Sequence, residues 1–205
     1  FFEIVADLIT QSVFPESELE KLRRQAIQDL RNLRNHDEAL VRKFFYQALY
    51  DGSPYGRSGK GTEATLNRIT RDDVVAFVAT HLRADNLFFA AAGDLSPDEL
   101  TDIVTTHFGA IPAGQVPVAP LPPDQPRAGR RLLIIDKPGR TQSQVIIGQH
   151  CIPAAHADYF PLLVAHTAFG GMMSAPFSRE IRDRRGWSYG ASSVLSPTTR
   201  TGTFS

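Results

Sequence analysis

Apolar residues in the first half of the chain recur at the three-and-four spacing of amphipathic helices. This pattern predicts four helices, over residues 1–13, 16–34, 37–50 and 97–108. A fifth helix is predicted to begin after Thr70, because Thr70 and Asp73 have approximately the spacing of a capping box. The apolar run from Asn86 to Ala92 predicts one buried strand. The first half is therefore expected to be mostly helical.

The pattern becomes β-like after a stretch rich in proline. Six prolines fall between Ile111 and Gly129 with almost no periodicity around them, which predicts an extended linker. Strands are predicted beyond the linker, over residues 131–136, 142–148 and 188–195 and again from residue 201. A turn is expected at Lys137-Pro138-Gly139. Two further helices are predicted, over residues 157–169 and from Ser174, as N-cap, to Arg185.

The order of these elements predicts the fold class. Strands that follow one another through tight turns, together with helices on either side of them in the sequence, are typical of an α+β fold. We therefore expect helices packed on a largely antiparallel β-sheet. Three regions are expected along the chain, namely a mostly helical region with one strand, a linker and a β-rich region, over residues 1–110, 111–129 and 130–205.

Composition and charge disfavour several classes of function. Hydrophobic residues make up 42% of the 205 residues, and 22 basic side chains balance 22 acidic ones. This suits a soluble globular protein and gives no net field to attract nucleic acid or an anionic membrane. No apolar run approaches the roughly 18 residues that a bilayer-spanning helix needs. The single Cys151 cannot form a disulfide within the chain.

Signatures of zinc, thiol, serine and nucleotide chemistry are absent. The sequence contains no H-x-x-E-H, C-x-x-C, G-x-S-x-G or phosphate-binding glycine loop. His150, Cys151 and His156 come nearest to a metal-binding cluster, but their spacing favours single side chains over a site. Gly170-Gly171 precedes a predicted helix and is best explained as a flexible or tightly packed turn.

The run from Glu180 to Tyr189, which reads E-I-R-D-R-R-G-W-S-Y, supplies the leading candidate for binding chemistry. Arg182 and Tyr189 lie seven residues apart across a predicted helix end, where Gly186 is expected to adopt the left-handed conformation that stops the helix. If the chain folds back there, both side chains can reach one point. A guanidinium and a phenol both donate hydrogen bonds, so they can orient a peptide carbonyl and stabilise its oxyanion.

The same run also has a purely structural explanation. Arginines in the last turn of a helix complement its dipole, and a glycine routinely follows. Tyr189 can simply be the aromatic residue on one face of a strand. The local pattern alone favours this structural explanation, because such helix ends are far commoner than functional Arg/Tyr pairs.

Seven motifs follow one another in the order and spacing of a known family. They are F-P-E-S-E-L-E from Phe14, S-P-Y-G-R from Ser53, I-T-R-D-D-V-V-A-F from Ile69, L-F-F-A-A-A-G-D to Asp94, D-K-P-G-R-T-Q-S-Q from Asp136, the Gly-Gly turn at Gly170, and R-E-I-R-D-R-R-G-W-S-Y from Arg179. Through them the chain resembles, nearly from end to end, the pitrilysin/insulinase family of zinc metallopeptidases. That family includes the mitochondrial processing peptidase and the core subunits of respiratory complex III.

The resemblance implies a processing-peptidase-like architecture of two homologous α+β domains. Residues 1–110 would be the back half of the first domain, 111–129 the linker, and 130–205 the front half of a second, non-catalytic domain. In the family the second domain contributes an Arg/Tyr pair that approaches the substrate, and Arg182 and Tyr189 match it. The third zinc ligand of the family is a glutamate, and Asp29 stands at that position here. No metal site is therefore expected in this chain.

Two functions are consistent with the resemblance. In the first, the chain is a non-catalytic, substrate-binding part of a zinc metallopeptidase, and it is inactive alone. Arg182 and Tyr189 then hold a peptide or unfolded protein, while a complementary catalytic domain or subunit binds the zinc. In the alternative, the chain is a structural or assembly subunit that has lost peptidase activity, which Asp29 favours. A compact unit is a further expectation, formed either by this chain on its own or, as a homodimer, by exchange between two copies. Both the bacterial periplasm and the cytoplasm are open as locations.

Overall fold

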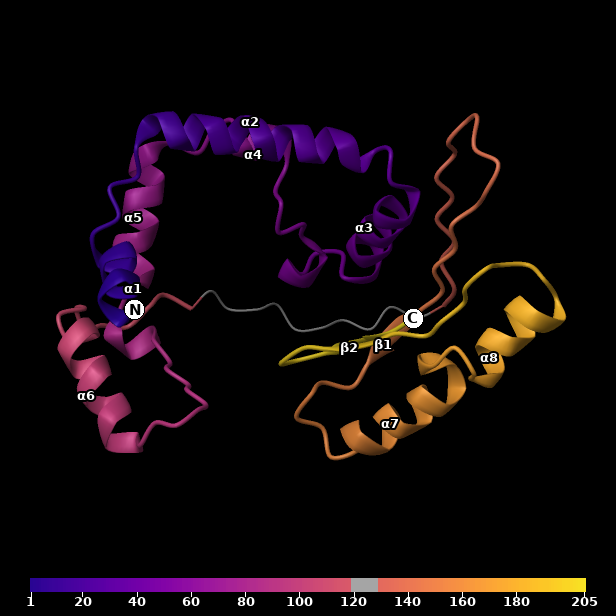
Figure 1. Ribbon diagram of the computed structural model, residues 1–205. Helices are drawn as coiled ribbons and strands as arrows, with labels where there is room; N and C mark the ends of the chain where they lie inside the picture. The colour runs from indigo at the N-terminus through magenta and orange to yellow at the C-terminus, as the bar shows by residue number, and fades with distance from the viewer. Residues whose placement is uncertain (119–128) are drawn as a thin grey trace. The chain divides into compact units, whose positions relative to one another are not determined.

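The computed structural model describes residues 1–118 and 129–205, which form two compact units (Figure 1). The first unit comprises Phe1–Asn32 and Gly59–Pro120, and the second comprises Leu33–Ser58 and Leu121–Ser205. The first unit contains α1 (Phe2–Thr10), α2 (Glu16–Leu33), α4 (Glu63–Leu66), α5 (Arg71–His81), the 3₁₀ turn η2 (Ala84–Asn86) and α6 (Pro97–Phe108). The second contains α3 (Asp37–Leu49), the 3₁₀ turn η1 (Pro54–Gly56), β1 (Gln149–Cys151), α7 (Tyr159–His166), the π-helix η3 (Thr167–Gly171), α8 (Pro176–Ser178), the π-helix η4 (Arg179–Arg184), β2 (Leu195–Pro197) and β3 (Gly202–Phe204).

Capping boxes fix where helices of the first unit begin. The amide of Thr70 donates to the Asp73 carboxylate at 2.8 Å, and the Asp73 amide donates to the Thr70 hydroxyl at 3.2 Å. The Thr70 amide and hydroxyl hold the pKa of the Asp73 carboxyl below its ordinary value. Ser96 and Glu99 form the same arrangement at the start of α6. The predicted capping box at Thr70 is confirmed, because its hydrogen bonds are local to the sequence.

A small apolar core holds the first unit together between α1 and α6 (Figure 1). Its buried members are Ala6, Phe108 and Ile111. The rings of Phe89 and Phe108 lie 4.9 Å apart, in a tilted arrangement. Burial of these side chains removes apolar surface from water, which is the main favourable contribution to the stability of this unit.

The second unit is organised around a three-stranded antiparallel sheet in the order β1-β3-β2. The central strand carries Thr203, which is 1% exposed, and its hydroxyl lies 2.6 Å from the hydroxyl of Tyr50 at the end of α3. Next to it, Nε2 of His150 lies 3.0 Å from the carbonyl oxygen of Leu49. Polar contacts therefore fasten the end of α3 to the sheet.

The predicted Lys137-Pro138-Gly139 turn is present, with Gly139 at a φ of +78°. Two cations of the turn reach the first residue of α3. Nζ of Lys137 donates to the Asp37 carboxylate, and Nε of Arg140 lies 3.1 Å from its second oxygen. The Lys137 hydrogen bond, and then the charge of Arg140, hold the pKa of the Asp37 carboxyl below its ordinary value.

Several predicted strands are wrong in this structure. Residues 86–92, 131–136 and 142–148 form no strand, and those at 88–92 and 131–148 make no backbone–backbone hydrogen bond within the described part of the chain. Phe88 is 91% exposed, where a buried strand was expected. The predicted strand at 188–195 is also wrong, since β2 begins only at Leu195. Local sequence shows a preference for extended backbone, but a strand exists only where a neighbouring strand accepts its hydrogen bonds.

The helices predicted in the second half agree better with the structure. α7 and η3 cover the predicted helix at 157–169, and α8 with η4 covers the one ending near Arg185. The predicted N-cap at Ser174 is wrong. The N-cap is Ala175, whose extended backbone leads into Pro176 at the first helical position, where its fixed φ suits the helix. The strand predicted from residue 201 is confirmed as β3.

The fold is helix-rich with a small antiparallel sheet, which confirms the α+β class at that level. The finer division into halves of two peptidase-like domains stays a prediction. Residues 119–128, with four of the six prolines of the predicted linker, lie outside the described residues. Among the helices that the structure describes, none has the length and hydropathy needed to cross a membrane.

Candidate functional site

The candidate Arg/Tyr pair lies at a helix end of unusual width. After α8 the chain continues as the π-helix η4, whose terminal hydrogen bonds reach back further than those of an α-helix. The amide of Arg185 donates to the carbonyl of Glu180 at 3.2 Å, and that of Trp187 donates to the carbonyl of Ile181 at 3.1 Å. Gly186 follows at a φ of +62°, so the predicted left-handed stop is confirmed. π-Helical turns are rare in proteins, and those that occur are often found at functional sites.

The structure brings Arg182 and Tyr189 together. The guanidinium carbon of Arg182 lies 5.4 Å from the centre of the Tyr189 ring, within the range of a cation–π contact. Tyr189 is 87% exposed, and the nearest acidic atom to the Arg182 guanidinium is a carboxylate oxygen of Asp183 at 3.8 Å. Within the described residues, no side-chain hydrogen bond occupies either the guanidinium or the phenol. Both groups are therefore available to donate to a ligand.

The neighbouring Arg184 and Arg185 both form ion pairs with Glu180. Arg184 donates to one carboxylate oxygen of Glu180 at 3.1 Å, and Arg185 donates to the other at 2.9 Å. The hydrogen bond from Arg185, and then that from Arg184, hold the pKa of the Glu180 carboxyl below its ordinary value. Glu180 therefore neutralises two of the three cations, whereas Arg182 has only the longer 3.8 Å ion pair with Asp183 in the described residues.

Sequence reasoning missed the roles of Glu180 and Trp187. The Arg185 guanidinium lies 4.6 Å from the centre of the Trp187 ring, which is 70% exposed. The signal for Glu180 was present, because a glutamate four residues before an arginine on a helix indicates an ion pair. The contact between Arg185 and Trp187 depends on the reversal at Gly186, which has no comparable periodic signal.

The residues at the expected metal position do not fit a zinc ion. Asp29 is exposed on α2, and no group of three or more potential metal ligands occurs in the part of the chain that the structure describes. The histidines on either side of Cys151 are occupied separately. His150 contacts the Leu49 carbonyl, and Nδ1 of His156 accepts a hydrogen bond from the Asp158 amide at 3.1 Å. These side chains do not form a cluster.

The Gly170-Gly171 turn is tightly packed. A Cβ atom at Gly170 would lie 2.8 Å from the hydroxyl of Ser193, and one at Gly171 would lie 3.1 Å from the His166 ring. Nε2 of His166 lies 2.9 Å from the Ser193 carbonyl oxygen, which joins α7 to the segment before β2. Of the two roles expected for this turn, close packing explains the glycines.

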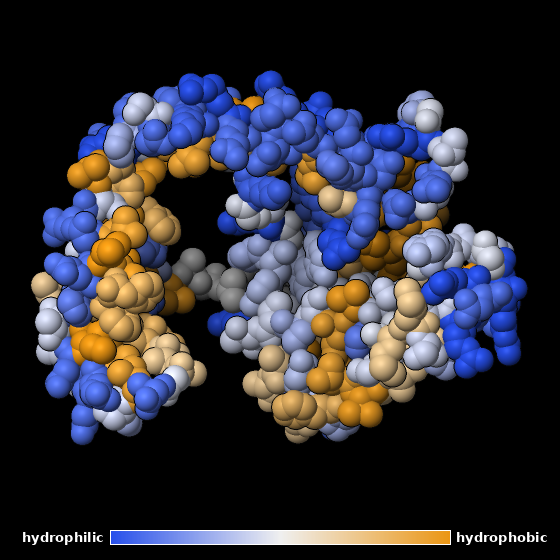
Figure 2. Space-filling model, viewed as in Figure 1, coloured by the Kyte–Doolittle hydropathy of each residue, from blue (hydrophilic) through white to orange (hydrophobic). Residues whose placement is uncertain are grey.

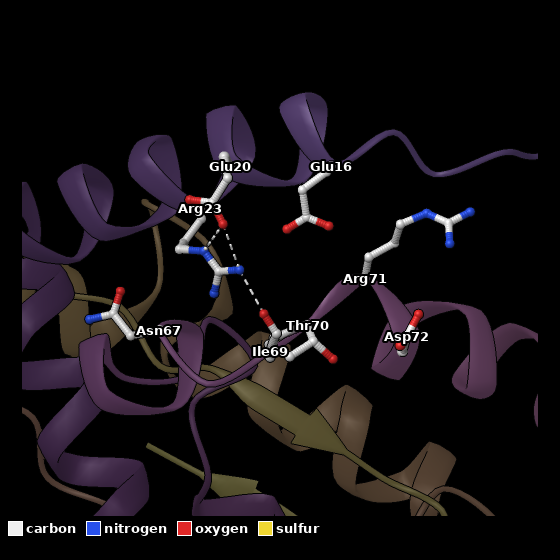
Figure 3. A pocket seen from close by; sticks show the side chains of 8 residues that line it. All are labelled: Glu16, Glu20, Arg23, Asn67, Ile69, Thr70, Arg71 and Asp72. Atoms are coloured by element: carbon white, nitrogen blue, oxygen red, sulfur yellow. Dashed lines mark hydrogen bonds and ion pairs between the residues drawn. The ribbon is translucent and has the colours of Figure 1, made fainter.

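A polar pocket of about 510 Å³ lies in the first unit, between the start of α2 and the start of α5 (Figure 3). Its two central cations bind the backbone. Arg23 donates to the carbonyls of Leu66 and Ile69, and Arg71 donates to those of Val13 and Phe14. These contacts give both arginines a structural role in joining α2 to the chain around α5.

The comparisons with known proteins identify the family. A family model described as the inactive domain of peptidase M16 matches residues 68–205, which is more than half of the chain. The chain belongs to the M16 peptidase family. This confirms the resemblance to the zinc metallopeptidases of the pitrilysin/insulinase type. The matched region contains Arg182 and Tyr189, whereas Asp29 lies before it.

Relatives in the M16 family have bacterial and mitochondrial sources. The β subunit of the human mitochondrial-processing peptidase is 29% identical over 171 residues, which cover 82% of this chain and 34% of that protein. An uncharacterised zinc protease of Rickettsia felis is 26% identical over 203 residues, covering 98% of this chain and 48% of that protein. The chain thus spans between about a third and a half of the length of these relatives.

A solved structure supports the M16 fold. The peptidase M16 inactive domain from Pseudomonas fluorescens matches with a TM-score of 0.83 and 21% identity. The match covers 99% of this chain and 49% of that one. The two chains therefore share a fold along the whole described length, including the segment around the Arg/Tyr pair.

Proposed function

We propose that this chain is the non-catalytic, substrate-binding part of an M16 zinc peptidase. Arg182 and Tyr189 donate hydrogen bonds to the peptide, while a complementary domain or subunit holds the zinc. The observation that carries this proposal is the contrast within one helix end. Arg184 and Arg185 are bound by Glu180, whereas Arg182 lies beside an exposed tyrosine with no hydrogen bond to its guanidinium in the described residues.

The geometry suits recognition of a peptide carbonyl. A guanidinium presents several N–H groups in one plane, and the Tyr189 ring beside it restricts its orientation. The exposed phenol adds a second donor. If both donate to the oxygen of the scissile carbonyl, they stabilise the negative charge that develops there in the tetrahedral intermediate.

The bond-breaking chemistry belongs to the partner. When bound by the complementary domain, zinc polarises the carbonyl and activates the attacking water. This chain orients the peptide and lowers the free energy of the oxyanion. We therefore expect no peptidase activity from this chain alone.

The test is steady-state kinetics of the chain combined with the zinc-bearing domain or subunit of its parent protein. Arg182→Ala and Tyr189→Phe are each expected to lower kcat/KM by about tenfold or more, because each removes one donor to the oxyanion. Tyr189→Phe is the more specific change, since it removes the phenol and retains the ring beneath Arg182. Unchanged kcat/KM in both variants would reject the proposal.

A second function, that of a structural subunit that has lost peptidase activity, is favoured by Asp29. Aspartate is one methylene shorter than the glutamate that the family expects, and it belongs to no group of three or more potential metal ligands in the described residues. The same reconstitution separates the two functions. A complex that assembles and binds zinc, yet cleaves no peptide in a library, would support the structural role.

A further inference from the structure

The chain reversal at Gly186 forms two contacts between an arginine and an aromatic ring. The guanidinium carbon of Arg182 lies 5.4 Å from the centre of the Tyr189 ring. That of Arg185 lies 4.6 Å from the centre of the Trp187 ring. The arginines are three residues apart at the end of η4, which makes them neighbours on one side of the helix, and both rings therefore face that side. Since the aromatic residues are two positions apart, their Cα atoms lie within about 7 Å of each other.

The Trp187 ring is held in one place without a ligand. Its backbone amide donates to the carbonyl of Ile181 at 3.1 Å. The Arg185 guanidinium that lies against the ring is itself fixed, because its Nε donates to the Glu180 carboxylate at 2.9 Å. Trp187 is 70% exposed, and its indole contacts no other aromatic ring in the described part of the chain. A side chain that is already ordered loses little conformational entropy when it binds a ligand.

Ser188, between the two aromatic residues, bonds the chain that follows it. Its hydroxyl donates to the Gly190 carbonyl at 2.6 Å and accepts from the Gly190 amide at 3.3 Å. Hydrogen bonds of this local kind are typical of a serine that stabilises a turn. The serine side chain is therefore used within the turn, and the two rings form the exposed surface beside Arg182.

The charge around Trp187 indicates which side chain its free face accepts. Residues 179–185 include four arginines and two acidic residues, so this helix end is net positive. It repels a lysine or an arginine of a peptide, and one face of the indole already contacts a guanidinium. An aromatic side chain carries no charge, and offset or edge-to-face aromatic pairs are stabilised beyond the burial of their area. The free face therefore suits an aromatic side chain best.

We propose that Trp187 determines specificity, by packing against an aromatic side chain of the peptide within two residues of the carbonyl that Arg182 and Tyr189 bind. The spacing supports this position. An extended peptide advances about 3.3 Å per residue, so two of its residues span the distance of at most about 7 Å between Tyr189 and Trp187. The inference rests on the proposed function, because it places the peptide at Arg182 and Tyr189.

The first test compares kcat/KM for pairs of peptides that differ only by phenylalanine or alanine at one position within two residues of the scissile bond. The chain is reconstituted with the zinc-bearing domain or subunit of its parent protein. The wild type is expected to favour phenylalanine by about tenfold at one such position. Trp187→Ala should reduce that preference to about twofold or less, chiefly through slower cleavage of the phenylalanine peptide. Trp187→Phe should retain most of the preference, because it keeps an aromatic ring.

Phe160→Ala is the matched control, because Phe160 is an aromatic residue of the second unit with a similar exposed fraction, 72%. It should leave the phenylalanine preference unchanged. Arg182→Ala separates this inference from the proposed function, since it should lower kcat/KM for both peptides by the same factor and leave their ratio unchanged. Unchanged kinetics in Arg182→Ala would count against the proposed function, while the peptide ratio still reports on Trp187. A wild type without the phenylalanine preference, or a Trp187→Ala variant slowed equally on both peptides, would overturn the role of Trp187.

The second test needs no cleavage. Trp187 is the single tryptophan, so its fluorescence reports directly on a side chain that packs against it. The whole chain is titrated with end-blocked alanine hexapeptides that carry phenylalanine, lysine or no replacement at the third residue. The phenylalanine peptide is expected to change the emission at a concentration about tenfold lower than either other peptide. A response to the alanine or the lysine peptide that equals or exceeds the response to the phenylalanine peptide would overturn the proposal.

Discussion

The two units of this chain are stabilised in different ways. In the first, the buried core is apolar and consists of Ala6, Phe108 and Ile111, and capping boxes fix the helix starts. In the second, the most buried side chains are largely polar, and a hydrogen bond between Tyr50 and Thr203 joins α3 to the sheet. The first unit therefore relies mainly on burial of apolar area, and the second also relies on hydrogen bonds between buried polar groups such as Tyr50 and Thr203.

Both units also expose apolar side chains, and Phe88 of the first unit is 91% exposed. In the second unit α7 exposes apolar side chains, including Phe160 at 72% and Val164 at 69%. Figure 2 shows orange surface in the region of that helix. The candidate site lies in this second unit, on the π-helical end that follows α8. Tyr189 is 87% exposed beside Arg182, so the stability of the second unit does not depend on burial of the tyrosine ring.

The largest effect is expected from Phe108→Ala in the first unit. Phe108 is 5% exposed, and truncation leaves a cavity beside Ala6 and Ile111. The free energy of unfolding should fall by about 3–5 kcal/mol. Far-UV circular dichroism in urea measures the loss, while fluorescence of Trp187, the single tryptophan, reports on the second unit. An equal shift of both signals would contradict separate stabilisation of the two units.

A smaller effect is expected from Tyr50→Phe in the second unit. The change removes the hydroxyl that lies 2.6 Å from Thr203, and it leaves the buried Thr203 hydroxyl without that partner. The cost is expected to be about 1–3 kcal/mol, measured by Trp187 fluorescence in urea. Adding Thr203→Val should recover part of the loss, because both polar partners are then gone. If the double variant is destabilised by the sum of the two single changes, the hydrogen bond is not what joins these residues.

The next effect in size is expected from Thr70→Ala at the start of α5. The substitution removes the hydroxyl that caps the Asp73 amide, at an expected cost of about 1 kcal/mol in the first unit. Thr80→Ala is the matched control, because Thr80 is a half-exposed residue within the same helix and its hydroxyl bonds only the Ala76 carbonyl in the described residues. Circular dichroism melts should separate the two variants, and similar stabilities would show that the cap contributes little.

The smallest expected effect is a pH dependence of the stability that the Asp37 carboxylate contributes. Contacts with Lys137 and Arg140 lower the pKa of this carboxyl in the folded chain, so folding favours its ionised form. The resulting stabilisation is present above the ordinary carboxyl pKa of about 3.9 and is lost as pH falls through the lowered folded value. Wild type should therefore lose its advantage over Asp37→Asn as the pH is lowered below about 4. A constant difference in urea stability across that range would contradict this assignment.

The parts of the fold that could be predicted are those whose determinants are local. The capping box at Thr70, the stop at Gly186 and the turn at Gly139 each depend on residues within a few positions of one another. The proximity of Arg182 and Tyr189 could be predicted for the same reason, since one glycine turn brings them together.

The rest depends on partners that are distant in sequence. Residues 131–136 have the composition of a strand, yet they form none. A strand requires backbone hydrogen bonds to a neighbouring strand, and these residues make no such bond in the described part of the chain. The contact between Tyr50 and Thr203 joins residues far apart in the chain and had no local signal. The local sequence also did not show that Glu180 forms hydrogen bonds with Arg184 and Arg185 and none with Arg182.

The central claim is that Arg182 acts on the substrate while Arg184 does not. The most direct measurement compares kcat/KM of Arg182→Ala and Arg184→Ala in the chain reconstituted with its zinc-bearing partner. Both variants lose one cation from the same helix end, so they share any general effect of charge or helix stability. The account predicts a loss of about tenfold or more for Arg182→Ala and near wild-type kinetics for Arg184→Ala. Equal losses in the two variants would contradict it.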